Sequence, residues 1–382
     1  MNPATGTNVS STKTAATTSA ATFYGTIGVV MVVIALLVFI DVRLARVETA
    51  ESQAEAERYF REGQESAKNG DYAQAVERFR TAASVQRNNM SVRVALAQAL
   101  FSAGRVEDAR TAASQILESD PTNADASLIM ARILKTDGNI DEAAIFYHRA
   151  IYGRWLQDPV KSSVDTRLEL ADLLAANNRT EDLLPELVAL QDEATDDVGV
   201  TRRIAHLYVA AGVSERASEL FTELLKQNPN DADAYAGLGE AEFARANYRT
   251  ARRNFETALK IQPESPEILS ELDLTDQVLT LDPLGRGISS QARYERSRML
   301  LEMAANSLKE CAGANPDYAV TAMVEQAQTQ LDRRVTTSQR NEAVDKNLDL
   351  AEQVWTLRGQ TCGAPANPSD KAVDLVLSRV AQ

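Results

Sequence analysis

Few residues in this sequence are suited to catalysis or to metal binding. The chain of 382 residues has two histidines, His148 and His206, and two cysteines, Cys311 and Cys362, and no pair of them has the spacing of a zinc ligand set. There is no glycine-rich phosphate loop and no Ser/His/Asp or Cys/His arrangement that would provide a nucleophile. The sequence therefore predicts that the chain is not an enzyme and that it has no metal site and no cofactor.

The charged residues are unevenly distributed along the chain. All 54 acidic residues follow Ile40, and Lys13 is the only one of the 40 basic residues before it, so the remainder has a formal charge of 39 − 54 = −15. An acidic body repels phosphate backbones, which argues against nucleic acid as a partner. Carboxylates such as Asp196 and Asp197 fall at expected turns and helix surfaces, where a solvated charge is the usual state.

The two cysteines are placed by helices that we expect near the C-terminus. Apolar stripes predict helices at about 289–311, 316–334 and 338–360, followed by a short amphipathic helix at 369–381. Cys311 ends the first of these helices and Cys362 follows the third, and in an up-down-up bundle those two ends lie together. The two sulfurs could therefore form a disulfide, which would stabilise the fold by about 4 kcal/mol in the chain-entropy model. Two ordinary thiols in a cytosolic domain are the alternative.

The first forty residues predict a membrane anchor. Residues 1–22 are mainly Ser, Thr, Ala and Asn and are interpreted as a disordered polar arm. Residues 23–40, FYGTIGVVMVVIALLVFI, contain no charge, and a helix of that length reaches roughly 27 Å, close to the thickness of a bilayer core. We predict a transmembrane helix at 23–40 and a juxtamembrane helical linker at 41–55. A cleaved signal peptide is the alternative interpretation.

Two features disagree on which side of the membrane the body lies. Arg43 and Arg46 follow the apolar run, against Lys13 before it, and this bias alone places the body in the cytoplasm. A disulfide instead requires an oxidising compartment such as the periplasm or the exterior. We expect a single-pass membrane protein with an extracytoplasmic body, and the cytoplasmic side stays open as the alternative.

Residues 56–265 repeat with a fixed period. Turn-forming residues recur at one constant spacing, with a single longer step between the third and the fourth, at Gly70, Gly104, Gly138, Asn178, Gly212 and Ala246. Small residues stand seven positions before each turn, at Gly63, Ala97, Ala131, Ala171, Ala205 and Gly239. A small residue lets two helices approach closely, and a glycine or asparagine can take the left-handed conformation that ends a helix. The pattern predicts helix pairs that must stack to bury their apolar faces.

This register resembles the tetratricopeptide repeat family. The resemblance is closest in Tyr235-x-x-Leu238-Gly239, in Ala251-x-x-x-Phe255 and in Pro263. It implies an all-α fold, a right-handed superhelical α-α solenoid of six repeats at 56–89, 90–123, 124–157, 164–197, 198–231 and 232–265. The fourth repeat matches least well, with Leu183 at a small position and Pro185 inside its second helix. A capping helix and loop are expected at 266–287, and a C-terminal helical module at 288–382.

The resemblance also implies a concave groove lined by the first helix of each repeat. Its groove positions fall on Phe60, Gln64, Val94, Gln98, Phe101, Leu128, Arg132, Lys135, Leu168, Asp172, Arg202, His206, Glu240 and Phe243. Three phenylalanines and a basic patch of Arg132, Lys135 and Arg202 would suit a peptide with apolar anchors and an acidic group. Alternatively, the aromatic rings pack against neighbouring helices. We expect His206 to be a groove or packing residue rather than a ligand.

A short insertion around 152–159 accounts for the longer step between the third and fourth turns. It forms either a longer helix end with a loop or a binding protrusion centred on Trp155, a residue type common at interaction hot spots.

These features predict a membrane-tethered scaffold or assembly factor that binds other proteins or peptides through the groove and the lipid bilayer through residues 23–40. A self-associating structural component of the envelope, with homo-oligomerisation of the chain, is the second hypothesis. An enzyme of unrecognised type is the third.

Overall fold

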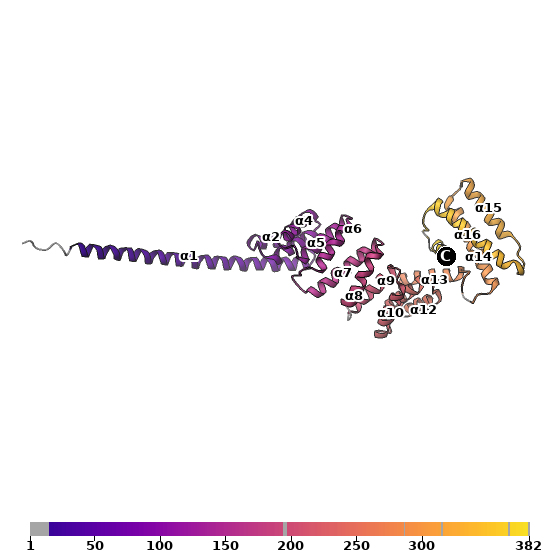
Figure 1. The fold of residues 1–382 in the computed structure, drawn as a ribbon, viewed down its shortest axis with the longest axis horizontal. Helices are drawn as coiled ribbons and strands as arrows, with labels where there is room; N and C mark the ends of the chain where they lie inside the picture. The colour runs from indigo at the N-terminus through magenta and orange to yellow at the C-terminus, as the bar shows by residue number, and fades with distance from the viewer. Residues whose placement is uncertain (1–14, 194–196, 286, 315, 366, 381–382) are drawn as a thin grey trace, which may run out of the picture. The chain divides into compact units, whose positions relative to one another are not determined.

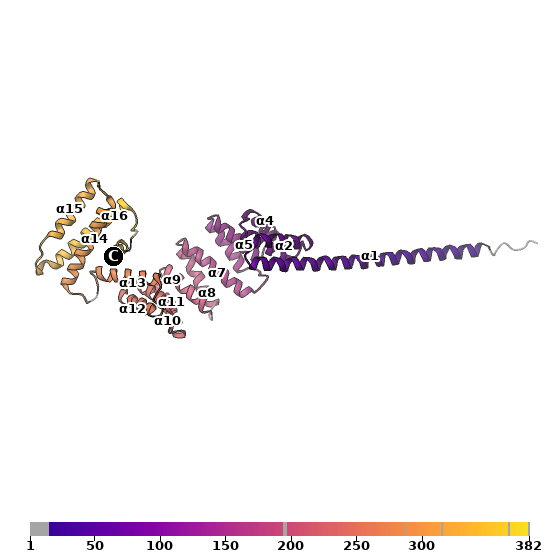
Figure 2. The same cartoon turned by 180° about the vertical axis from the view of Figure 1, so that it is seen from behind.

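The computed structural model describes the backbone of residues 15–193, 197–285, 287–314, 316–365 and 367–380. In the first helix, the side chains of residues 15–26, 41 and 44–50 are outside this description. Every regular element of the described backbone is helical, and the only strand-like pairing there is an isolated bridge between Asn123 and Arg154. The helices are seen from opposite sides in Figures 1 and 2. The chain divides into two compact units, Met1–Thr166 (unit 1) and Arg167–Gln382 (unit 2).

Unit 1 begins with one long helix, α1, which spans Ala15–Lys68. It contains the predicted span 23–40, the predicted linker 41–55 and the first helix of the first repeat. Within the described part of the chain, no helix has an apolar stretch long enough to cross a membrane, and the side chains of 23–26 are among those not described. Residues 1–14 of the predicted polar arm lie outside the described residues, and residues 15–22 belong to α1.

Three helix pairs make up the repeats of unit 1. The end of α1 pairs with α2 (Tyr72–Val85), α3 (Met90–Ser102) pairs with α4 (Val106–Ser119), and α5 (Ala124–Thr136) pairs with α6 (Ile140–Ile151). One hydrophobic core runs through these pairs from Phe79 on α2 to Ile133 on α5. Stacking therefore supplies the burial that a single pair lacks.

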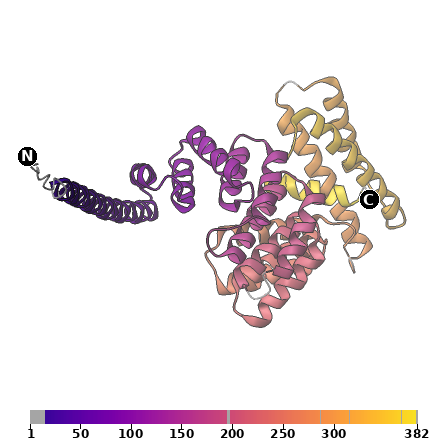
Figure 3. The same cartoon turned by 60° about the vertical axis from the view of Figure 1, so that its left-hand side comes forward.

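Unit 2 continues the helix pairs and ends in a separate module. The boundary between the two units falls inside helix α7 (Pro159–Ala176). The helices that follow are α8 (Thr180–Glu193), α9 (Val198–Ala210), α10 (Ser214–Gln227), α11 (Ala232–Ala244), α12 (Tyr248–Ile261) and α13 (Pro266–Leu281). The module comprises α14 (Ser290–Ala312), α15 (Tyr318–Asp332), a short 3-10 helix (Thr337–Gln339), α16 (Arg340–Cys362) and α17 (Pro368–Val380). Helix α17 is the yellow helix that ends at the label C in Figure 3.

The turn inside each repeat has the predicted left-handed conformation. Gly70 and Gly212 have φ angles of 80° and 75°, and the two residues that replace glycine, Asn178 and Ala246, have φ angles of 54° and 57°. A β-carbon is unfavourable in this region, so Ala246 keeps the turn only because the flanking helices are held in place.

Close packing explains why small residues recur seven positions before the turn. A β-carbon added at Gly63 would lie 2.7 Å from the ring of Phe79, and one added at Gly239 would lie 2.6 Å from the ring of Phe255. In both cases the glycine belongs to the first helix of a repeat and the ring to its second helix. The two helices are therefore in van der Waals contact at these points, as the sequence pattern predicts.

The poorly matching fourth repeat contains a buried ion network. Pro185 lies inside α8 near its beginning, where only one hydrogen bond of the first turns is lost. Arg167, with 2% of its surface exposed, donates to Glu186 at 2.6 Å and to Glu193 at 2.9 Å. A buried guanidinium is tolerated only with such carboxylate partners.

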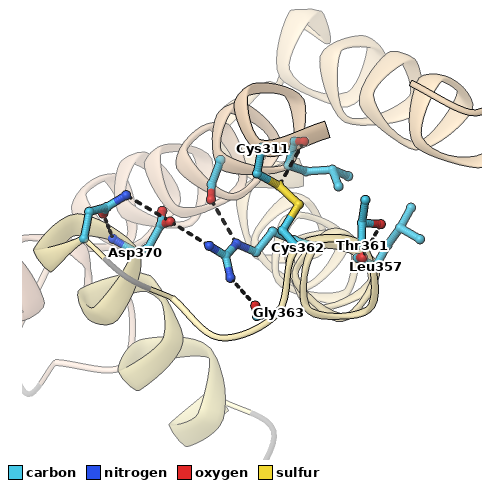
Figure 4. The surroundings of a disulfide bond; sticks show 10 residues. Cys311, Leu357, Thr361, Cys362, Gly363 and Asp370 are labelled. Atoms are coloured by element: carbon cyan, nitrogen blue, oxygen red, sulfur yellow. Dashed lines mark hydrogen bonds and ion pairs between the residues drawn. A yellow bond between two sulfur atoms is a disulfide. The ribbon is translucent and has the colours of Figure 1, made fainter. Parts of the chain in front are cut away.

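The C-terminal module contains the predicted disulfide. Cys311 lies near the end of α14 and Cys362 is the last residue of α16, and their Cα atoms are 6.1 Å apart across a bond between the two sulfurs. Figure 4 shows this bond beside Gly363 and Asp370. The prediction of a Cys311–Cys362 disulfide is confirmed, and α16 extends two residues further than expected so that Cys362 belongs to the helix.

Candidate functional site

The first helices of unit 1 present a partly apolar surface, here called the unit 1 surface. Its residues are the predicted groove positions Phe60, Gln64, Val94, Gln98, Phe101, Leu128, Arg132 and Lys135. The four apolar side chains are all half-buried, and Phe60, Val94 and Phe101 pack against the core of the unit. The ring of Phe60 lies 5.6 Å from that of Phe79. Phe60 and Phe101 are thus partly exposed on the surface and partly packed against neighbouring helices.

Polar groups border the apolar side chains of the unit 1 surface. Gln64 is exposed, and the half-buried Gln98 donates to the hydroxyl of Ser102 at 3.3 Å. On α5, Arg132 is half-buried and Lys135 is exposed at the C-terminal end of the helix. The surface thus offers shallow apolar contacts with amide groups and an ammonium group at its α5 edge.

The corresponding helices of unit 2 present a charged surface, here called the unit 2 surface. It comprises Asp172, Arg202, His206, Glu240 and Phe243. Asp172 forms an ion pair with Arg203 of the next first helix, and Arg202 donates to the buried Asp231 at 2.5 Å. Leu168 has only 3% of its surface exposed, so this predicted groove residue is a core residue and does not belong to the surface.

His206 and Glu240 lie next to each other on the unit 2 surface. The Nδ1 atom of His206 lies 3.3 Å from the carboxylate of Glu240, and its ring packs edge-on against Phe221 with the centroids 4.9 Å apart. Burial raises the pKa of Glu271 on α13, and the nearby charge of Glu240 raises it further. His206 therefore both packs against the core and faces a carboxylate.

Phe243 and Arg202 both contribute to the fold as well as to the unit 2 surface. The ring of Phe243 lies 5.1 Å from that of Tyr248 and packs against two core clusters, so only part of it is accessible. Arg132 and Lys135 belong to unit 1, whereas Arg202 belongs to unit 2 and is already paired. Arg132 and Lys135 are therefore described with the unit 1 surface and Arg202 with the unit 2 surface.

The inserted loop around Trp155 is anchored to the preceding repeat. The backbone N–H of Arg154 donates to the carbonyl of Thr122 at 2.7 Å, and the N–H of Leu156 donates to the carboxylate of Asp125 at 3.1 Å. Burial raises the pKa of this carboxyl group. Trp155 is half-buried, and its indole nitrogen is buried without a hydrogen-bond partner. Trp155 is thus partly inserted into the fold, whereas Tyr152 beside it is 75% exposed.

Sequence reasoning missed the partners of several of these side chains. His206 and Glu240 stand one repeat period apart. Arg203 follows Asp172, and Glu271 follows Glu240, by three positions less than one period. Residues at either of these two separations on neighbouring first helices therefore face each other, and a search for opposite charges at these intervals would have identified the Asp172–Arg203 pair.

Neither surface contains an arrangement typical of catalysis. In the described part of the chain, no group of three or more His, Cys, Asp or Glu side chains is placed to hold a metal ion. What the described side chains offer is contact area, hydrogen-bonding groups and charge.

Comparisons with known sequences identify the repeats. Two models described as "Tetratricopeptide repeat" match residues 66–133 and 202–266. These matches, together with the helical pairs, confirm the predicted tetratricopeptide-type repeats in those stretches. The described backbone of the whole repeat region consists of helix pairs.

The sequence is also similar to one curated protein. It is 26% identical over 260 residues to the cellulose synthase operon protein C of Pseudomonas fluorescens (strain SBW25). The matched region is 66% of this chain but 20% of that protein, so the chain spans about a fifth of the length of this relative.

Similar solved structures are also tetratricopeptide repeat proteins or described as biogenesis factors. A tetratricopeptide repeat protein from Parabacteroides merdae is 15% identical, with 72% of this chain and 99% of that chain covered and a TM-score of 0.43. PilW, titled a type IV pilus biogenesis factor, is 17% identical, with 57% and 98% covered and a TM-score of 0.45. YrrB, titled a protein with an unusual peptide-binding site, is 20% identical, with 50% and 95% covered and a TM-score of 0.41.

Proposed function

We propose that this chain is a membrane-tethered, non-catalytic scaffold that binds partner proteins through the first helices of its repeats. The observation that carries the proposal is the unit 1 surface, where half-buried apolar side chains on α1, α3 and α5 are bordered by amides and by Lys135. Half-exposed aromatic and aliphatic side chains in a rigid frame are suited to protein contacts, because they provide contact area with little loss of side-chain entropy.

The same surface suggests the chemistry of the partner segment. Phe60, Val94 and Phe101 would accommodate apolar side chains of a peptide, while Gln64 and Gln98 would hydrogen-bond to its backbone. Lys135 stands exposed at the end of α5, where it favours a carboxylate on the peptide. The proposed ligand is a peptide with apolar anchors and an acidic group at one end.

Two features support tethering at a membrane in an oxidising compartment. The uncharged run 23–40 has the composition of a membrane anchor, and it lies in the same uninterrupted helix, α1, as the beginning of the first repeat. A rigid connection of this kind would hold the first repeat near the bilayer and raise the effective concentration of its partners there. The disulfide favours a periplasmic or exterior location for the body.

Self-association is a second candidate function. Four large apolar side chains between residues 145 and 160 of unit 1 are exposed, namely Ile145, Tyr152, Leu156 and Val160. An exposed group of this kind favours contact with another protein surface, including a second copy of the chain. Light scattering from the purified protein over a range of concentrations distinguishes a constant mass from concentration-dependent assembly.

Site-specific photo-crosslinking tests the unit 1 surface. A photoreactive amino acid at Gln64 or at Lys135, both exposed, is expected to form adducts with the same partner in cells. The matched control places it at Glu77 on α2, which is also exposed but belongs to a second helix. Substitution of Lys135 by Glu should reduce the adduct formed at Gln64, because the carboxylate of the partner is then repelled. Equal adducts at Gln64 and Glu77 would contradict the proposal.

Thiol labelling in intact cells tests the compartment. If the body lies in an oxidising compartment, a membrane-permeant maleimide should label Cys311 and Cys362 only after treatment with a reductant. Labelling of both thiols without reductant would place the body in a reducing compartment.

A further inference from the structure

The C-terminal helix α17 packs along α13, the last helix of the repeat array. Its apolar stripe consists of Ala372, Val373, Val376 and Leu377, all of which are buried. These side chains belong to the same core cluster as Val278 and Leu281 of α13, and Phe243 of α11 packs against that cluster. The end of the array is therefore covered by a segment that is far from it in sequence.

Charged residues at both ends of α17 face carboxylates of the array. Near its beginning, the charge of Lys371 is close enough to Glu271 to lower the pKa of that carboxyl group, against the larger effect of burial. Near its end, Arg379 donates to Asp282 at 2.8 Å, and its guanidinium lies 5.6 Å from the centre of the Tyr248 ring. Because the first contact joins 371 to 271 and the second joins 379 to 282, α17 and α13 run parallel.

The face of α13 under α17 continues the unit 2 surface. Leu274 and Gln277 stand one repeat period after Glu240 and Phe243, so they occupy the equivalent positions of the next first helix. Leu274 packs against the cluster that contains the apolar stripe of α17, and the amide oxygen of Gln277 is buried without a hydrogen-bond partner. The positions that are partly open on α9 and α11 are thus covered on α13.

The two ends of α17 are attached to different parts of unit 2. Its first turn is attached to the module, where the buried Asp370 accepts from Arg358 at 3.1 Å and Asp374 accepts from the indole nitrogen of Trp355 at 2.8 Å. Arg358 lies one turn before Cys362 on α16. The disulfide and the ion pair between Arg358 and Asp370 therefore both hold the C-terminal end of α16 in place. The last turn is attached to the array by the ion pair between Arg379 and Asp282.

We propose that the face of α13 beneath α17 is a docking site for an amphipathic helix with basic residues at both ends, and that α17 is its built-in occupant. A partner helix of the same pattern binds there by displacing the last turns of α17. The occupant is identified by the helix that is seated there and by charge, since Asp282 of the site pairs with Arg379 and Glu271 lies within the electrostatic reach of Lys371. This inference deepens the proposed scaffold function and rests on it, but its test does not use the unit 1 surface.

A peptide supplied in trans tests the site in the full-length chain. The probe is a fluorescent synthetic peptide of residues 367–382, titrated into the detergent-solubilised protein. Substitution of Arg379 by Glu places a second negative charge beside the buried Asp282, which loosens the last turn of α17. The peptide, which carries the native arginine, should then bind about tenfold more tightly than it binds the unsubstituted chain, since breaking the half-buried pair of Arg379 with the buried Asp282 removes its competitor from the site.

Three controls make every outcome decisive. A peptide with Glu in place of Arg379 should bind neither protein, and the chain with Lys309→Glu, a charge reversal on an exposed part of α14, should behave like the unsubstituted chain. The chain with Val376→Asp, which weakens the apolar contact instead of the ion pair, should also gain peptide binding. If limited proteolysis shows that α17 is released in either variant without peptide binding, or if α17 is not released at all, α17 is an ordinary structural helix and the proposal is wrong.

Discussion

Replacing Gly237 by alanine tests the packing of the repeats most directly. Gly237 lies inside α11, and an added β-carbon would be 2.2 Å from the Cζ atom of Phe221 and 2.4 Å from Cε1 of the same ring. Phe221 has no exposed surface and its ring packs against His206. The ring cannot rotate away from the new methyl group, because both of its edges lie within 2.7 Å of that position.

Two opposing contributions determine the sign of the effect. Alanine is favoured over glycine inside a helix by about 1 kcal/mol. Overpacking in a core of fixed shape costs about 1–3 kcal/mol, and a contact as short as this one belongs in the upper part of that range. We therefore expect Gly237→Ala to lower the free energy of unfolding by about 1–2 kcal/mol.

A matched glycine in the same unit provides the control. Gly359 also lies inside a helix, α16, and an added β-carbon there would have no atom within 4 Å. Gly359→Ala should therefore raise the free energy of unfolding by up to about 1 kcal/mol, since only the helix preference changes. Urea denaturation followed by circular dichroism measures both variants. If Gly237→Ala stabilises the protein as Gly359→Ala does, the close approach of α11 to Phe221 is absent and the packing argument fails.

Three further predictions concern single features of unit 2. Replacing Ala246, whose φ is 57°, by glycine should raise the free energy of unfolding by up to about 1 kcal/mol, whereas Gly212→Ala at the equivalent turn should lower it by a similar amount; thermal melts measure both. Replacing Cys311 and Cys362 by serine should lower it by up to about 4 kcal/mol, given the sequence separation of 51, and a melt unchanged by the substitution or by reductant would contradict this. Burial raises the pKa of Glu271 above 4.5, so the folded state binds the proton of this group more tightly than the unfolded state does, and the group destabilises the fold as the pH rises above 4.5. Glu271→Gln should therefore stabilise the protein at pH 7 and have no effect at pH 3, which melting temperatures measured against pH will show.

The helix pairs could be predicted from the sequence because their determinants are local and periodic. Each turn needs a residue that tolerates positive φ, and each helix crossing needs a small residue opposite a ring, as at Gly239 and Phe255. The turn and the small residue recur once in every repeat, whereas the ring is replaced by Ala113 in the second repeat and by Leu187 in the fourth. The disulfide was predictable for a related reason, since helix lengths alone determine that Cys311 and Cys362 lie at the same end of the module.

The candidate surfaces could be predicted only in part, because pairing between helices depends on how each helix is rotated. The groove positions were transferred one by one from the repeat pattern, which does not show which charges are neutralised. Arg202 is paired with Asp231, a residue whose other carboxylate oxygen caps α11 by accepting from the N–H of Ala234. A side chain that appears available in the sequence is thus committed to the fold. Leu168, which was predicted to line the groove, is likewise committed to the fold, because its side chain is buried in the core.

The position of α17 could not be predicted, although its existence could. An amphipathic stripe at 369–381 shows that a helix buries one face, but it does not show against which surface. The ion pair that decides the matter joins Arg379 to Asp282, 97 residues earlier, and no period of the sequence relates them. Because the pair lies where the repeat pattern ends, the covered face of α13 is a specific property of this chain. The repeat pattern alone would leave that face open to a partner, so in this protein the binding of a helix there must include the cost of releasing α17.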